Sequence, residues 1–243
     1  MTHKEHVLLD GPAGKIEVFV ETRDAPAGIA LIAHPHPLYG GTADNKVVTT
    51  LARTFRELGC VALRPNFRGV GGSEGVHDHG EGEAEDLLVV HSWARQRFGS
   101  ELPVYLAGFS FGAHVVTKVA KRLAAAGDAA SRLVLVGTAA GMIGPPRSPL
   151  TTEARLAAPH GGAHAVLGRP GDGMVAGLRR YETEAVPADT IVIHGAKDTT
   201  VPLENVLAWA EPLDLPVVVI PGADHFFHRR LHLIRDIIRR QWH

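Results

Sequence analysis

The stretch LAGFSFGAH, residues 106–114, places a serine between two glycines in the pattern G-x-S-x-G. The apolar run PVYL precedes it, which is typical of a buried strand, and a stretch of helical period follows it. A serine on the sharp turn between a buried strand and a helix forms a nucleophile elbow, because the strained turn exposes the hydroxyl and the glycines allow close packing. The pattern predicts a reactive Ser110; the alternative is a tight turn with an incidental serine.

Short apolar runs recur on both sides of this stretch, each closed by glycine or proline. They occupy residues 28–34, 60–67, 103–110, 132–139, 190–195 and 216–222. Such runs are typical of strands that are buried on both faces. Helical periodicity at residues 47–58 and 115–123, each stretch followed by a glycine, separates some of them.

Strands that alternate with helices predict one α/β domain over residues 1–243, with a mostly parallel twisted sheet covered by helices on both faces. The alternating segment KIEVFVET, residues 15–22, is predicted to be an edge strand, and residues 227–242 a final basic helix. From residue 140 to residue 188 the sequence shows no convincing strand, and only weak helical patches at 151–158 and 174–181. We interpret 140–188 as an irregular insertion, either a lid or a surface loop.

The bulk composition argues against several classes of protein. The chain has 243 residues, 45% of them hydrophobic, and a formal net charge of -1, so neither a nucleic acid nor a membrane surface is expected as a partner. The single cysteine, Cys60, lies in an apolar stretch and suggests a buried thiol in a reducing compartment. The first residues lack a signal-peptide core and no stretch is long enough to span a membrane. We therefore expect a cytoplasmic protein.

A reactive serine needs a base, and the base needs a carboxylate that orients it. Asp198 follows the run TIVIHG and His225 follows the run PVVVIPG, so both are expected at the same sheet edge as Ser110. The chain order Ser, Asp, His is the order of an α/β-hydrolase sheet. The competing residues are less well placed: Asp172, Asp189, Asp224, His194 and His228.

The motif HPHP, residues 34–37, comes where a serine mechanism needs a second backbone donor for the oxyanion. Phe111, which follows the serine, supplies the first amide. Pro35 and Pro37 have no N–H, so His36 and Leu38 carry the only nearby amides that can point inward. We favour the His36 amide, with Leu38 as the alternative.

A metal site is the rival interpretation of the same histidines. The side chains that could bind the metal ion in such a site are His34, His36, His77, His79, Asp198 and His225. This hypothesis leaves the serine elbow unexplained, and no carboxylate stands at the H-E-x-x-H spacing, so we expect neither a metal nor a cofactor. His77 and His79 are predicted to be exposed loop histidines.

The sequence resembles the α/β-hydrolase superfamily, in particular bacterial small serine hydrolases with little or no cap domain. The stretches AHPHPLYGGTADNKVV, RPNFRGVGGSEG, AGFSFGAH, VIHGAKDTTVP and IPGADHFFH carry the resemblance over nearly the whole chain. It implies an eight-stranded-type sheet, a triad of Ser110, Asp198 and His225, and acyl transfer from esters without a cofactor. The segment 140–188 departs from the brief connection of the cap-less group.

The expected substrate is a small carboxylic ester. A thioesterase, an amidase or a small peptidase would use the same groups, and a binding protein on a hydrolase scaffold is an alternative of another class. Leu38, Tyr39 and Phe109 are candidates for substrate contact. Arg68, in the glycine-rich turn at residues 64–75, is expected to anchor its loop, with binding of a substrate carboxylate as the alternative. The oligomeric state stays open.

Overall fold

The computed structural model describes residues 2–144 and 178–242. The strands are β1 (Thr2–Gly11), β2 (Gly14–Arg23), β3 (Gly28–Ala33), β4 (Cys60–Pro65), β5 (Val104–Phe109), β6 (Arg132–Val136), β7 (Gly141–Ile143), β8 (Arg179–Tyr181), β9 (Ile191–Gly195) and β10 (Val217–Ile220). The α-helices are α1 (Lys46–Glu57), α2 (Glu81–Phe98), α3 (Phe111–Ala125), α4 (Leu203–Ala210) and α5 (Leu231–Arg240).

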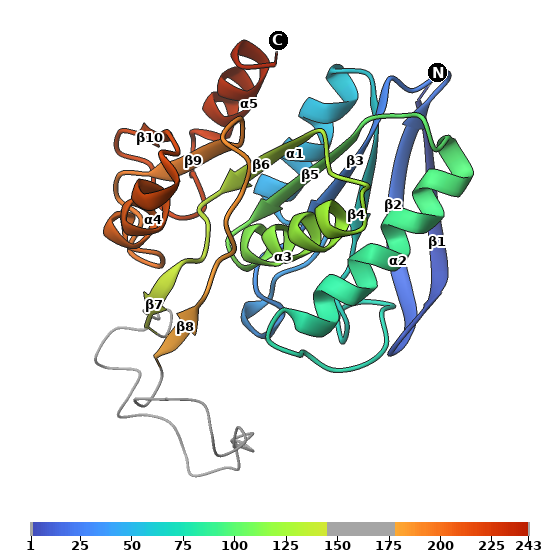
Figure 1. Ribbon diagram of the computed structural model, residues 1–243, viewed down its shortest axis with the longest axis horizontal. Helices are drawn as coiled ribbons and strands as arrows, with labels where there is room; N and C mark the ends of the chain where they lie inside the picture. Colours follow the sequence, from blue (N-terminus) through green and yellow to red (C-terminus); the bar gives the residue numbers. More distant parts are fainter. Residues whose placement is uncertain (1, 145–177, 243) are drawn as a thin grey trace.

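Eight of these strands form one sheet in the order β1-β2-β4-β3-β5-β6-β9-β10. The neighbouring strands β4, β3, β5, β6, β9 and β10 pair in parallel. β2 pairs antiparallel with both of its neighbours, β1 and β4. Helices α2 and α3 cover one face, and α1 and α5 cover the other (Figure 1). All six predicted strands, the helices at 47–58 and 115–123 and the closing helix are confirmed, as is the predicted α/β fold in a single domain. Burial on both faces is wrong for β10, which lies at the far edge of the sheet with three of its four residues half-buried.

The prediction that residues 15–22 form an edge strand is wrong. β2 lies between β1 and β4, and β1 is the edge. The alternation in β2 has another cause, since Ile16, Val18 and Val20 face the core while Glu17 and Glu21 are buried among polar partners on the opposite face. Period-2 alternation reports the polarity of each face and does not show whether a neighbouring strand is present.

The segment 140–188 is less irregular than predicted at its two ends. β7 and β8 pair antiparallel there, with Gly141 opposite Tyr181 and Ile143 opposite Arg179. The patch at 174–181 therefore ends in a strand and not in a helix. The predicted lid and the helical patch at 151–158 fall largely or wholly on residues 145–177, outside the described residues.

The parallel strands bring their carboxyl ends to one edge of the sheet. Ala33 at the end of β3 is in register with Gly108 of β5, and Phe109 with Val136 of β6. The segments that follow β3, β5, β6, β9 and β10 therefore meet at this edge, where side chains from distant parts of the sequence come together. Within the described residues, no helix is long and apolar enough to cross a membrane.

Candidate active site

Ser110 occupies the strained turn that its sequence context predicts. The residue has φ 56° and ψ -118°, a left-handed conformation that is unusual for a residue with a side chain. Its amide donates to the carbonyl of Val136 at 2.9 Å, which ties the turn to β6. A Cβ atom on Gly108 would lie 2.4 Å from the carbonyl oxygen of Gly112, and one on Gly112 would lie 2.4 Å from that of Ala33. Both glycines are required by close backbone contacts.

The structure brings Ser110, His225 and Asp198 into one hydrogen-bonded chain. His225 Nε2 lies 3.0 Å from Ser110 Oγ, and His225 Nδ1 lies 2.7 Å from Asp198 Oδ2. All three side chains are buried. Because an ionised carboxylate only accepts, Asp198 fixes the proton of His225 on Nδ1 and leaves Nε2 free to accept the proton of the serine hydroxyl.

The second oxygen of Asp198 is held by backbone amides. Asp198 Oδ1 accepts from Thr200 at 2.9 Å and from Val201 at 2.8 Å. His194 approaches the same carboxylate, with Nε2 at 3.5 Å from Oδ2 and 3.0 Å from the carbonyl of Val201. His194 is fully buried, as predicted for an interior histidine, and burial lowers its pKa. These contacts orient Asp198 toward His225.

The competing residues lie elsewhere. Asp224 accepts from the amide of His228 at 3.0 Å and pairs with its ring at 2.6 Å on the exposed surface. Asp189 precedes β9 and pairs with Arg132 at 3.5 Å. Asp172 falls outside the described residues. Among the candidates that the structure describes, Asp198 and His225 are the two that join Ser110 in the hydrogen-bonded chain, whereas His194 only approaches Asp198 from outside it.

The first histidine of HPHP is structural. His34 is fully buried; its Nδ1 donates to the carbonyl of Pro35 at 2.6 Å, and its Nε2 accepts from the amide of Phe67 at 2.9 Å. Burial lowers the pKa of His34 to about 4, so the ring stays neutral at neutral pH. His34 therefore joins the loop after β3 to the loop after β4.

The second histidine faces the nucleophile elbow. The His36 ring lies 4.8 Å from that of Phe111, centroid to centroid, and its Nε2 contacts Arg179 Nη1 at 2.5 Å. The Leu38 amide approaches its Nδ1 at 3.3 Å. A neutral imidazole has one acceptor nitrogen, and the shorter contact, with a guanidinium that can only donate, assigns acceptance to Nε2. Nδ1 then carries the proton and cannot accept from Leu38.

Two backbone amides near Ser110 have no acceptor within the described part of the chain. They belong to Phe111, which begins α3, and to His36. By the proton count above, the amide of Leu38 is a third. Burial, together with the charge of Arg179, lowers the pKa of His36 to about 3, so its ring adds no positive charge of its own.

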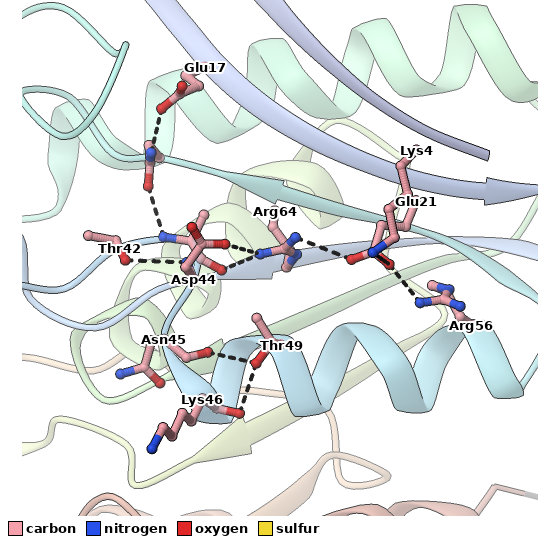
Figure 2. A network of polar contacts seen from close by, with 12 residues as sticks. Lys4, Glu17, Glu21, Thr42, Asp44, Asn45, Lys46, Thr49, Arg56 and Arg64 are labelled. Atoms are coloured by element: carbon pink, nitrogen blue, oxygen red, sulfur yellow. Dashed lines mark hydrogen bonds and ion pairs between the residues drawn. The ribbon is translucent and has the colours of Figure 1, made fainter. Parts of the chain in front are cut away.

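A polar network fixes the chain just beyond this loop. Arg64 Nη1 donates to the carbonyl of Ala43 at 2.6 Å and to Asp44 at 3.0 Å, while its Nη2 donates to Glu21 at 3.2 Å (Figure 2). On the other side, the Ala43 amide donates to Asn66 at 2.8 Å. The segment between β3 and α1 is therefore anchored to β2 and to β4, which limits movement of the HPHP loop.

The three candidates for substrate contact differ in placement. Leu38 and Tyr39 are 63% and 50% exposed. Phe109 is fully buried, and its ring lies 4.9 Å from that of His225. Phe109 thus packs behind the histidine, whereas Leu38 and Tyr39 offer apolar surface to solvent.

Two further sequence-based expectations can now be compared with the structure. Arg68 is structural, as favoured, because it donates twice to Asp86 at 2.8 Å in a buried bidentate pair. The prediction that His77 is exposed is wrong: its side chain is nearly buried and bonds Glu83 at 2.8 Å, while His79 is exposed as predicted. Among the described residues, no group of three or more His, Cys, Asp or Glu side chains could hold a metal ion.

Sequence reasoning missed one residue at this site. Arg179, in β8, contacts the His36 ring and stacks over Tyr39, with its Cζ 4.6 Å from the ring centroid. Its partner His36 is 143 positions away in the sequence, and Arg179 belongs to no motif. It lies in β8, which pairs with β7 in a small separate sheet outside the main one (Figure 1).

Solved structures share both this fold and part of this sequence. An α/β serine hydrolase homologue from Coxiella burnetii is 35% identical with a TM-score of 0.70, and the match covers 97% of this chain and 96% of that one. The chain belongs to the α/β serine hydrolases. A second α/β serine hydrolase, from Xanthomonas campestris and described as having no lid, is 31% identical with a TM-score of 0.69; 98% of this chain and 94% of that one are covered.

The curated proteins that resemble this α/β serine hydrolase match it over a smaller part of their length. An uncharacterized protein of Rickettsia prowazekii is 40% identical over 117 residues, which are 48% of this chain and 49% of that protein. The chain matches about half the length of its curated relatives. No protein-family model matches it.

Proposed function

We propose that this α/β serine hydrolase cleaves small carboxylic esters through an acyl-enzyme, with Ser110 as nucleophile, His225 as general base and acid, and Asp198 as the orienting carboxylate. The observation that carries the proposal is the pair of contacts that joins them, 3.0 Å from Ser110 Oγ to His225 Nε2 and 2.7 Å from His225 Nδ1 to Asp198 Oδ2. Both distances suit proton transfer within an ordered triad.

In the first half-reaction, Ser110 Oγ attacks the ester carbonyl while His225 Nε2 takes the hydroxyl proton. The tetrahedral intermediate collapses when His225 returns that proton to the departing alkoxide, which leaves as an alcohol. In the second half-reaction, water attacks the acyl-serine, and His225 again removes a proton and returns it to Ser110. Asp198 stabilises the imidazolium in both steps without becoming protonated.

The oxyanion is stabilised in this scheme by the amides of Phe111 and His36, with the Leu38 amide as a further donor. These donors are in place before substrate arrives because α3 fixes the first and two prolines flank the second. Leu38 and Tyr39 then contact the apolar part of the ester. The Phe109 ring packs against the His225 ring and limits its movement.

The test compares matched ethyl ester, ethyl thioester and amide substrates of the same short acid. We expect the ester to give the highest kcat/KM, and Ser110→Ala and His225→Ala each to lower kcat by about 10³-fold or more. His228→Ala is the matched control, because His228 is exposed and its ring pairs with Asp224, outside the hydrogen-bonded chain of Ser110. A Ser110→Ala protein with more than a tenth of wild-type activity would refute the nucleophile, and a faster thioester or amide would change the substrate class.

A further inference from the structure

Arg179 is a cation beside the proposed catalytic residues that has only neutral partners in the described structure. Its guanidinium contacts His36 Nε2, lies over the Tyr39 ring and interacts with the Tyr181 hydroxyl. No carboxylate from residues 2–144 or 178–242 pairs with it. The neighbouring arginine differs, since Arg180 pairs with Glu182 at 3.3 Å.

The comparison with Arg68 shows why this matters. The charge of Arg68 is neutralised by Asp86 through a bidentate pair, so Arg68 has no fork left for a ligand. A guanidinium presents five N–H donors in a planar fork that matches a carboxylate or a phosphate. Arg179 uses donors on His36 and on the Tyr181 hydroxyl, and its Cζ lies over the Tyr39 ring, which orients the guanidinium and leaves other N–H donors for a ligand.

Arg179 is also close to where the substrate must bind. The ring that it contacts, His36, belongs to the residue whose amide is proposed to bind the oxyanion, and the same ring packs at 4.8 Å against Phe111, which follows Ser110. An anionic group a few bonds from the ester carbonyl would therefore reach the guanidinium. The low pKa of His36, about 3, means that its ring adds no positive charge of its own beside Arg179 at neutral pH.

We propose that Arg179 binds an anionic group on the substrate, so that the preferred esters carry a carboxylate or a phosphate-like group a few bonds from the scissile carbonyl. This inference rests on the proposed function and specifies its substrate class. The anion replaces the water around a partly buried guanidinium, and the charge-assisted bonds orient the ester over Ser110.

The experiment uses three ethyl esters that differ only in the distal group: ethyl hydrogen succinate, ethyl 3-phosphonopropanoate and the neutral ethyl succinamate. We expect wild-type kcat/KM to be highest for one of the two anionic esters, which identifies the anion. Arg179→Gln should lower kcat/KM for that ester at least tenfold more than for ethyl succinamate, and Arg179→Lys should have an intermediate effect because it keeps the charge but loses the fork.

Arg180→Gln is the matched control, because Arg180 is one position away on the same strand and its side chain is exposed. In this variant the ratio of kcat/KM for the anionic ester to kcat/KM for ethyl succinamate should stay within about twofold of the wild-type ratio. Since loss of Arg179 also disturbs His36, the ratio between esters is the deciding readout. An equal loss for all three esters in Arg179→Gln would overturn the inference and assign Arg179 to positioning His36.

Hydrolysis of a fourth ester, 4-nitrophenyl acetate, distinguishes a failure of this inference from a failure of the proposed function. A wild-type protein that cleaves 4-nitrophenyl acetate but prefers ethyl succinamate to both anionic esters would overturn the anion site alone. A wild-type protein that cleaves none of the four esters would overturn both proposals. Melting temperatures of all variants establish that each is folded when assayed.

Discussion

Acidification from pH 8 to pH 5 should strongly destabilise this protein because three histidines are buried as neutral rings. Burial lowers the pKa of His34 and of His114 from 6.5 to about 4. Burial and the charge of Arg179 lower the pKa of His36 to about 3. In the unfolded chain each ring titrates near 6.5.

The sign and the size of the effect follow from these values. Well above pH 6.5, as at pH 8, the three rings are neutral in both states, so their contribution to stability does not change. Between pH 6.5 and about pH 4 the unfolded chain takes up protons that the folded protein cannot accept, and the free energy of unfolding falls. At pH 5 the linkage relation gives about 2 kcal/mol per histidine, or about 6 kcal/mol for the three. That is comparable to the whole stability of many domains.

Urea denaturation at pH 8 and at pH 5, at constant ionic strength, measures this difference directly. His114→Asn provides the matched variant, because Asn can retain the contact that His114 Nδ1 makes with Thr183 Oγ1 at 3.1 Å. The variant should lose about 2 kcal/mol less than wild type on acidification. A wild-type loss below about 1 kcal/mol, or an unchanged loss in the variant, would refute the neutral burial of these rings.

Two further predictions concern the scaffold of the site. Asp86→Asn removes the buried bidentate partner of Arg68 and leaves only its longer contact with Asp78 at 3.9 Å, so the free energy of unfolding should fall by about 3–5 kcal/mol. Arg53→Gln breaks an exposed i,i+4 pair and should cost less than about 1 kcal/mol; equal losses in urea denaturation would contradict this. Gly112→Ala places a Cβ 2.4 Å from a carbonyl oxygen at the end of β3, so kcat/KM for an ester should fall by about 100-fold or more, and near-normal activity would show that the elbow tolerates side chains there.

The parts of the fold that could be predicted are those in which burial produces a simple pattern of apolar residues in the sequence. Strands buried on both faces are continuous apolar runs, and all six such runs are strands. Because the strands are parallel, residues just after them share one edge, and this reasoning selected Asp198 and His225, which the structure joins to Ser110. The rule uses only local sequence and the common direction of the strands.

Helix α2 went unpredicted because its buried face mixes polar with apolar residues. Glu83, Asp86 and His91 are buried there beside Leu87 and Val90, so no apolar stripe is visible. The polar residues have partners outside the helix: Glu83 has them in the loop that directly precedes it, and Asp86 in the loop after β4. A periodicity argument counts such positions as exposed.

Strand β1 and Arg179 were missed for related reasons. β1 carries polar and charged residues along the exposed edge of the sheet, where it pairs with β2 and only Val7 and Leu9 among its described residues pack against the core. Arg179 owes its place to the three-residue pairing of β7 with β8. Short strand pairs of this kind depend on the surrounding tertiary structure, which no local pattern records.

The most direct test of the central claim, an activated serine at position 110, is labelling with a fluorophosphonate followed by intact-mass measurement. Wild type, Ser110→Ala and His225→Ala are treated in parallel, and a fourth sample of wild type contains a chelator. The account predicts one adduct on wild type, with or without chelator, none on Ser110→Ala and strongly slowed labelling of His225→Ala. An adduct that persists in Ser110→Ala would contradict the claim and place the reactive nucleophile at another residue. Ester hydrolysis that stops on chelation, with no adduct on wild type, would also contradict the claim and would favour the metal interpretation of the histidines.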